Sequence, residues 1–337
     1  MKTVGLTFDL KDDYRLLGYS EEEIAEFDSR DTIDAIENTL SSLGYNTIRI
    51  GNINSLTDFL ALGKRCDIVF NICEGMNGVA REAQVPGLLD AYKIPYVFSG
   101  PDILSLTLDK ALTKLVVKEA GIRTAPYKLL KQNERLKDPG LTYPLFVKPL
   151  GEGTSKGVDG HSLVYDFSEL KNSCSYLIDT FHQPVLIETF LPGREFTVGI
   201  LGSGSAGRVL GVMEVVFNKN CSHKIYSYSV KKEYEKYVSY QIANDAPAME
   251  CAAMAKKIWK LIDGKDAGRI DFKLDPTEKP NFVEVNPLAG LNPVYSDLPI
   301  ICKLIGLEYR ELISEIMNSA VSRALLNTQK AIGTTVL

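Results

Sequence analysis

The chain has 337 residues and a formal net charge of −5 at pH 7; 45% of the residues are hydrophobic and 24% are charged. This length predicts two or three globular domains, because a single core usually stops growing near ~250–300 residues. The negative charge argues against nucleic acid or an anionic membrane as the main partner. No apolar run reaches the ~18 residues of a membrane span, and the six scattered cysteines include no C-x-x-C pair. We therefore expect a cytoplasmic protein with reduced thiols.

The first hundred residues alternate between strand-like and helix-like patterns. Short apolar runs predict three buried strands, which are TVGLTF (3–8), NTIRI (46–50) and CDIVFNI (66–72). Segments with helical periodicity lie between or after them, at 31–44, 81–92 and 101–121. Alternation of this kind indicates an α/β fold with an open, mostly parallel sheet.

The pattern changes after about residue 122. Strand-like runs joined by turns follow one another at 144–150, 185–191, 195–202 and 208–217, which favours antiparallel sheet and an α+β organisation. A long helix is predicted at 249–262, followed by two more strands and then by helices to near residue 325.

Those two strands carry polar residues at spacings of two. Arg269 and Asp271 form one such pair, and Glu284 and Asn286 form the other. Side chains at i and i+2 of a strand point to the same face, so each pair projects together. The pattern predicts an oxygen-rich site beside an arginine, although two exposed strand edges with solvated charges would have the same pattern.

A glycine-rich segment, KPLGEGTSKGV (148–158), could wrap its backbone N–H groups around an anion. It is not a Walker A motif, and the third glycine of G-x-G-x-x-G is replaced by Lys156. A plain β-hairpin turn explains the segment equally well. Lys148 supports the anion site, because a lysine that ends an apolar strand just before a proline is unusual in a purely structural role.

Five segments in this order resemble ATP-grasp enzymes, and more narrowly the D-alanine–D-alanine ligase family. They are FSGPDILSLTLDKALTK (98–114), FVKPLGEGTSKGV (146–158), VLIETFLPGREFTVGIL (185–201), GRIDFKLD (268–275) and VEVNPLAGL (283–291). The resemblance implies three α/β domains with ATP held between two sheets. We expect an N-terminal parallel α/β domain at 1–105, a central subdomain at 106–185, a C-terminal subdomain at 186–325 and a tail at 326–337.

The resemblance also implies roles for residues at the nucleotide. Lys110 and Lys148 match lysines that contact ATP phosphates, and Glu152 precedes Thr154 and Ser155 in a loop that closes over them. Glu188 matches the carboxylate on the adenine side and Glu195 the one on the ribose side. Without the resemblance, Lys110 fits a solvated helix face, and both Glu188 and Glu195 fit ordinary surface positions.

The implied metal ligands are Asp271, Glu284 and Asn286, which would hold Mg²⁺, with two ions expected and Mn²⁺ as an alternative. The implied reaction forms an acyl phosphate from one amino acid, and the amine of a second amino acid then displaces the phosphate. Arg269 and the backbone N–H of Gly290 match the groups that stabilise the developing charge.

The sequence departs from the family pattern where amino acids would bind. The segment 6–29 replaces a glycine-rich signature, so Glu26 or Asp28 is expected to take the place of the glutamate that holds the first ammonium group. Helix capping explains Asp28 equally well. The segment 71–90 lacks the usual histidine–glycine pattern.

Further departures lie on the opposite side of the expected substrate site. In the segment 224–237, Lys231 matches a lysine of a mobile loop, whereas Lys232 replaces a tyrosine at the first substrate. Ser296 is retained as an anchor for the second carboxylate, and Asp297 follows it where an apolar residue is expected.

The sequence as a whole predicts an ATP-dependent carboxylate–amine ligase, with D-alanyl-D-alanine as the expected product. Two alternatives stay open: a ligase that joins other amino acids, and a nucleotide-binding protein without catalysis. The expected ligands are ATP, Mg²⁺ and small amino acids, and the resemblance makes a homodimer the expected assembly.

Overall fold

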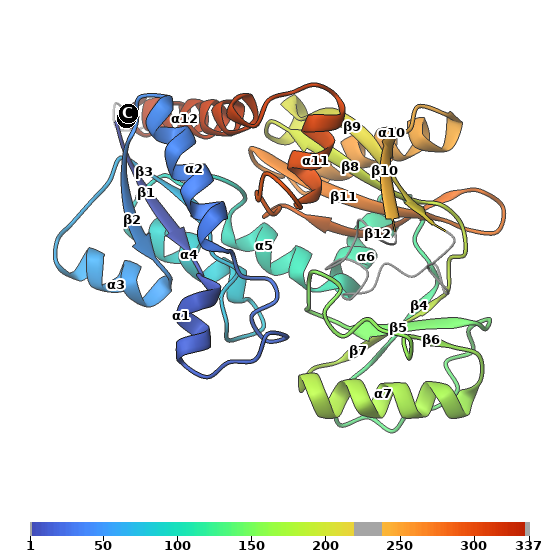
Figure 1. Cartoon of the computed structure of the whole chain (residues 1–337). Coiled ribbons are helices and arrows are strands. Elements are labelled where there is room, and N and C mark those ends of the chain that lie inside the picture. Colours follow the sequence, from blue (N-terminus) through green and yellow to red (C-terminus); the bar gives the residue numbers. More distant parts are fainter. Residues whose placement is uncertain (1, 219–237, 334–337) are drawn as a thin grey trace.

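The computed structural model describes residues 2–218 and 238–333, and the side chains of 327–333 are not described (Figure 1). The predicted substrate-loop residues Lys231 and Lys232 lie outside the described residues. The described residues form three sheets, of which the first is parallel and the other two are antiparallel. The predicted α/β and α+β organisation is therefore confirmed.

The first sheet has the strand order β2-β1-β3, from β1 (Thr3–Phe8), β2 (Asn46–Gly51) and β3 (Ile68–Ile72). Its strands are parallel because helices connect them. These helices are α1 (Lys11–Leu16), α2 (Arg30–Ser42) and α3 (Ile53–Ala61). A short 3₁₀ turn (Arg81–Ala83) then leads into α4 (Gln84–Ala91). The apolar stripe predicted on α2 is buried, including Ile33, Ile36 and Leu40.

The single helix predicted at 101–121 is wrong, because the structure has two helices there. They are α5 (Pro101–Leu108) and α6 (Lys110–Glu119), and they separate at Asp109. Asp109 has extended backbone angles, and its carboxylate accepts a hydrogen bond from the Leu112 amide at 2.9 Å, which is an N-cap. The break makes Lys110 the first residue of α6.

The second sheet has the order β4-β7-β5-β6, and helix α7 (Phe167–Phe181) covers one face of it (Figure 1). The strands are β4 (Tyr127–Leu130), β5 (Leu145–Pro149), β6 (Leu163–Val164) and β7 (Val185–Thr189). Strand β7 pairs with both β4 and β5, so this sheet extends past residue 185, where we placed a domain limit. The domain limits themselves stay a prediction.

The third sheet has the order β10-β9-β8-β11-β12. Its strands are β8 (Glu195–Leu201), β9 (Arg208–Phe217), β10 (Val238–Ile242), β11 (Ala267–Leu274) and β12 (Pro280–Asn286). Helix α10 (Ala246–Leu261) packs on it through the fully buried Trp259, and the 3₁₀ turn Gly204–Ala206 connects β8 with β9.

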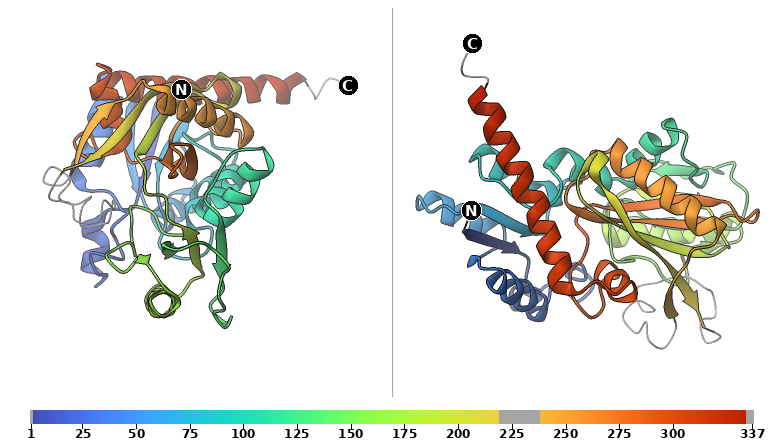
Figure 2. Two further views of the ribbon diagram at one scale, coloured as in Figure 1. Left: turned by 90° about the vertical axis from the view of Figure 1, so that its right-hand side faces the viewer. Right: turned by 90° about the horizontal axis from the view of Figure 1, so that it is seen from above.

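The C-terminal helix returns to the first sheet. After α11 (Asp297–Leu304), helix α12 (Tyr309–Gly333) runs back across the molecule (Figure 2). Its residues Leu312, Ile316 and Met317 join the same core as Val4 and Ile33. Within residues 2–218 and 238–333, no helix has the length and apolar character of a membrane span.

Asp266 links three parts of the chain just before β11. It is fully buried, and its Oδ2 accepts the Phe98 amide at 2.8 Å and pairs with Arg323 at 2.6 Å. Its Oδ1 accepts hydrogen bonds from Ser203 at 3.2 Å and from Ser319 at 2.8 Å. One carboxylate thus connects the segment just before α5, the turn between β8 and β9, and helix α12.

We predict that Asp266→Ala lowers the free energy of unfolding by about 2–4 kcal/mol, because it leaves the partly buried Arg323 and several buried donors without their acceptor. Urea unfolding followed by circular dichroism measures this. The matched control is Asp263→Ala, since Asp263 also has a positive φ (54°, against 62° at Asp266) but is 69% exposed. Equal losses in the two variants would show that backbone strain, and not the hydrogen-bond network, is what matters.

Candidate active site

Two cavities meet at strands β11 and β12. One is a narrow cleft of about 150 Å³ between the second and third sheets, and the other is a cavity of about 520 Å³ toward the first domain. Four charged residues line both of them: Lys110, Arg269, Glu284 and Asp297. A ligand in one cavity would therefore meet a ligand in the other at these side chains.

The polar pairs predicted from the sequence lie side by side on the third sheet. β11 and β12 are antiparallel, with Asp271 directly opposite Glu284 and Arg269 opposite Asn286. Asn286 donates a hydrogen bond to Glu284 at 3.4 Å, and Thr197 of β8 donates one to Asp271 at 3.0 Å. The solvated strand edges considered above do not occur, because these side chains line the cavities and are mostly covered.

Cations surround the two facing carboxylates. The guanidinium of Arg269 contacts Asp271, and its Nε lies 3.5 Å from Asp297. Lys110 Nζ lies 3.8 Å from Glu284. Asp297 stands where the family resemblance predicts an apolar residue. Its side chain is buried and lies beside Arg269.

The pKa values of the two carboxylates differ because their surroundings differ. Burial raises the pKa of Asp271 to about 6, although Arg269 opposes the rise. Burial also acts on Glu284, but Lys110, Lys148 and Arg269 together outweigh it and lower its pKa to about 2. Both groups are therefore anionic at neutral pH and can serve as hard oxygen ligands.

The donor set fits magnesium. Asp271 and Glu284 offer carboxylate oxygens and Asn286 offers an amide oxygen, whereas zinc sites prefer sulfur and nitrogen. Among the residues that the structure describes, no group of three or more histidine, cysteine, aspartate or glutamate side chains converges on a metal position. A site with so few protein carboxylates suits Mg²⁺, which usually keeps waters and shares substrate phosphates as ligands.

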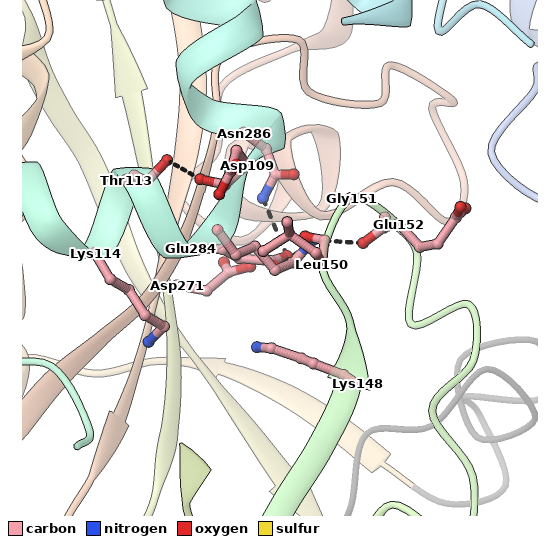
Figure 3. Close-up of polar contacts among 12 residues, drawn as sticks. Asp109, Thr113, Lys114, Lys148, Leu150, Gly151, Glu152, Asp271, Glu284 and Asn286 are labelled. Carbon is pink, nitrogen blue, oxygen red and sulfur yellow. Dashed lines mark hydrogen bonds and ion pairs between the residues drawn. The ribbon is translucent and has the colours of Figure 1, made fainter. Parts of the chain in front are cut away.

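Two lysines and a glutamate lie on the other wall of the cleft. Glu188 of β7 accepts from Lys114 of α6 at 2.6 Å and from Lys148 of β5 at 3.0 Å. The side chains of Lys114 and Lys148 reach toward the same space from these two elements (Figure 3). Burial alone would raise the pKa of Glu188, but the two lysines outweigh it and lower the pKa. Glu188, predicted on the adenine side, is thus also the counter-ion of both lysines.

Lys114 was missed in the sequence. It is 1% exposed and donates to Thr124 at 2.8 Å as well as to Glu188. A signal was present, since Lys114 follows Lys110 by four residues and so lies on the same helix face. Lys110 itself is buried, so the solvated helix face considered above is wrong.

The cleft also has an apolar end and a second carboxylate. Phe146, Phe190 and Leu191 line it, as an adenine-sized aromatic ring requires. Glu195, predicted on the ribose side, lines the same cleft and accepts from Lys273 at 2.7 Å.

The glycine-rich segment connects β5 to β6 and folds over the cleft. Thr154 and Ser155 have φ values of 49° and 57°, so consecutive residues adopt the left-handed conformation. Two side chains hold the loop at Glu152. Lys110 Nζ donates a hydrogen bond to the Glu152 carbonyl at 2.5 Å, and Gln183 Nε2 donates one to Glu152 Oε1 at 2.6 Å. Because β5 and β6 pair antiparallel, the segment does connect a β-hairpin, but it does so through a longer loop that lines the cleft with Glu152 and Ser155.

The second cavity contains the other predicted substrate residues. Glu26 and Asp28 line it from the segment that follows α1, and Gly290 and Ser296 line it from the loop before α11. A side chain at Gly290 would meet Ser296 Oγ at 2.9 Å, so the Ser296 hydroxyl would have to move. Ser296 is the N-cap residue of α11, but its side chain makes no capping hydrogen bond. Its Oγ accepts instead from the Asn292 amide at 3.0 Å.

Asp28 does not cap α2, because Ser29 is the N-cap residue. Burial raises the pKa of the Asp28 carboxyl to about 7, against the opposing effect of Lys11. A carboxyl whose pKa is raised on folding binds a proton more tightly in the folded state. Its contribution to stability is therefore lost as pH rises from about 4, the unfolded value, to about 7.

We predict that Asp28→Asn stabilises the protein at pH 8 by about 1–2 kcal/mol and has little effect at pH 4.5. The cavity gives the carboxylate some hydration, so we expect less than the full linkage value. Thermal unfolding of wild type and variant at both pH values measures this. A variant that gains nothing at pH 8 would mean that Asp28 is well solvated or well paired.

Comparison with known proteins places the chain in a family. Residues 116–318 match the family model described as D-ala D-ala ligase C-terminus. The chain is 32% identical over 303 residues to the D-alanine–D-alanine ligase of Aquifex aeolicus, covering 88% of this chain and 96% of that one. It is 32% identical over 262 residues to the D-alanine–D-alanine ligase of Bordetella petrii, covering 76% and 77%.

Solved structures show the same fold. The D-alanine–D-alanine ligase of Bacillus anthracis, solved with ATP, superposes with a TM-score of 0.75 over 97% of this chain and all of that one, at 20% identity. The VanG D-Ala:D-Ser ligase of Enterococcus faecalis superposes with a TM-score of 0.70 over 95% and 99%, also at 20% identity. The chain belongs to the D-alanine–D-alanine ligase family and has the ATP-grasp fold.

Proposed function

We propose that this protein is an ATP-dependent ligase that joins two D-alanine molecules through an acyl phosphate. One observation carries the proposal: a lysine-lined cleft and a second cavity share Lys110, Arg269 and Glu284. Phosphoryl transfer to a carboxylate needs this arrangement, because the phosphate donor and the carboxylate must approach each other at cationic side chains.

In the first step, a carboxylate oxygen of the first amino acid attacks the γ-phosphorus of ATP, and the bond to the β-phosphate oxygen breaks to release ADP. Lys110 and Lys114 of α6 and Lys148 of β5 would hold the nucleotide phosphates. The amides of the loop with Thr154 and Ser155 would cover them. Arg269 would orient the attacking carboxylate and offset its charge.

Magnesium, when bound, would neutralise phosphate charge as a Lewis acid. Asp271, Glu284 and Asn286 would hold it on the strands, where their positions are fixed by the sheet. Glu284 suits this role because the nearby cations keep it ionised.

In the second step, the free amine of the second amino acid attacks the acyl carbon, and the tetrahedral intermediate then expels inorganic phosphate. Arg269 and the amide of Gly290 would stabilise the oxyanion. Within the described residues, the Gly290 amide donates no hydrogen bond, so it is available to a ligand. Ser296 would anchor the second carboxylate, and Lys231 would act from the segment outside the described residues.

A different amino acid in one of the two substrate positions is a second candidate. The cavity of about 520 Å³ falls in the range of pockets that hold ligands larger than alanine. Lys232 belongs to this question, since it replaces the tyrosine expected at the first substrate. We further propose a cytoplasmic homodimer.

We predict that Asp271→Asn or Glu284→Gln lowers kcat at least 100-fold at saturating ATP–Mg²⁺, because each removes a charged metal ligand. Phosphate release measures the rate, and circular dichroism checks the fold. The comparison variant is Glu278→Gln, at an exposed position in the turn that follows β11. Near-normal turnover in the folded Asp271 and Glu284 variants would remove these residues from the metal site.

The proposed reaction is tested by phosphate release with ATP–Mg²⁺ and each D- and L-amino acid, with the product identified by mass spectrometry. D-alanine is expected to stimulate release and to yield the dipeptide. Stimulation only by another amino acid would establish the second candidate. No stimulation by any amino acid would overturn a ligase function.

A further inference from the structure

Arg81 connects the first domain to the glycine-rich loop. It lies in the 3₁₀ turn before α4, and only 9% of it is exposed. Its Nη1 donates to the carbonyl oxygen of Gly151 at 2.7 Å, and its Nη2 donates to Glu26 Oε2 at 2.6 Å. The guanidinium thus bridges two segments that are far apart in the sequence, the segment after α1 and the glycine-rich loop.

Glu26 completes this connection. Its Oε2 pairs with Arg81, and its Oε1 accepts the backbone N–H of Gly153. A side chain at position 153 would collide with the Glu26 carboxylate, so glycine is required for this close approach. Both oxygens of Glu26 are therefore already used by the chain itself.

The chemistry of arginine suits this bridge. A planar guanidinium can donate in two fixed directions at once and stays charged when buried, whereas an ammonium is a single point charge on a flexible stem. The neighbouring carboxylates of Glu74 and Glu82 favour the charged form of Arg81 further. The contacts to Gly151 and Gly153 are charge-assisted, and such hydrogen bonds are stronger than neutral ones.

We propose that Arg81 and Glu26 form a positioning pair that fixes residues 151–153 of the glycine-rich loop over the cleft. In this role Glu26 serves the loop and does not hold the ammonium group of the first amino acid, which revises our expectation from the sequence. The effect on catalysis rests on the proposed function, because only there does the loop cover ATP phosphates. The contact itself can be tested without any substrate.

Hydrogen exchange of the protein alone is the first test. In Arg81→Met, which keeps the apolar stem, and in Glu26→Gln, the Gly153 amide is expected to exchange at least tenfold faster than in wild type. The Gly151 amide is an internal reference, because it donates to Gln183 at 2.7 Å and not to Glu26. Arg208→Met is the matched control, since Arg208 forms an exposed pair with Glu315 away from the loop.

Unchanged exchange at Gly153 in both folded variants would overturn the pair. If Arg81→Met unfolds, Arg81→Lys decides in its place. It should retain the pairing with Glu26 but lose part of the bridge, and so show intermediate exchange at Gly153. If the Gly153 amide of Arg81→Lys exchanged at the wild-type rate, the proposal would also be overturned.

Kinetics separate positioning from substrate binding. We expect Arg81→Met and Glu26→Gln to lower kcat/KM for ATP about tenfold and to change the KM for the first amino acid less than twofold. A rise of tenfold or more in the amino-acid KM of Glu26→Gln, with unchanged kcat/KM for ATP, would return Glu26 to the ammonium group. If wild type shows no ligase activity, the proposed function fails, whereas the exchange result still decides the pair.

Discussion

The structure depends on two carboxylates that face each other across β11 and β12. Asp271 lies directly opposite Glu284, and like charges at such positions destabilise a sheet. Burial increases the repulsion, because water no longer screens it. The chain offsets this with Arg269 beside Asp271 and Lys110 beside Glu284. A chain with no use for concentrated negative charge would be more stable with apolar residues at these positions.

The surrounding fold is arranged to bring cations to this point. Lys110 begins α6 because Asp109 ends the helical run, and Lys114 lies one turn further along the same face. Lys148 enters from β5 of the second sheet, where Glu188 keeps it and Lys114 in place. The charges of the cleft therefore form one balanced network spread over two sheets and a helix. The pKa values of Asp271 and Glu284 shift in opposite directions because each carboxylate has different cations of this network beside it.

The sequence predicted what depends on local pattern. On β11, Arg269 and Asp271 lie on one face, and Ile270 and Phe272 lie in the core. The sequence of the strand shows this alternation of polar and apolar residues directly. The helix break at Asp109 was missed because apolar residues continue on both sides of it, so the periodicity does not change. The contacts of Arg81 with Glu26 and Gly151 could not be predicted from the sequence for another reason. Arg81 is 55 positions from Glu26 and 70 positions from Gly151 in the sequence. Contacts over such separations form only when the chain has folded.

The two cavities differ in how their walls are built. The cleft brings together the lysines, the carboxylates and the loop that the sequence resemblance indicated. The second cavity is walled on one side by the segment that follows β1, which has its own small core of Tyr14, Ile24 and Phe27. A wall with its own core can change without disturbing the sheet that carries Asp271 and Glu284. A change in this wall would therefore leave in place the four charged residues that both cavities share, which are Lys110, Arg269, Glu284 and Asp297.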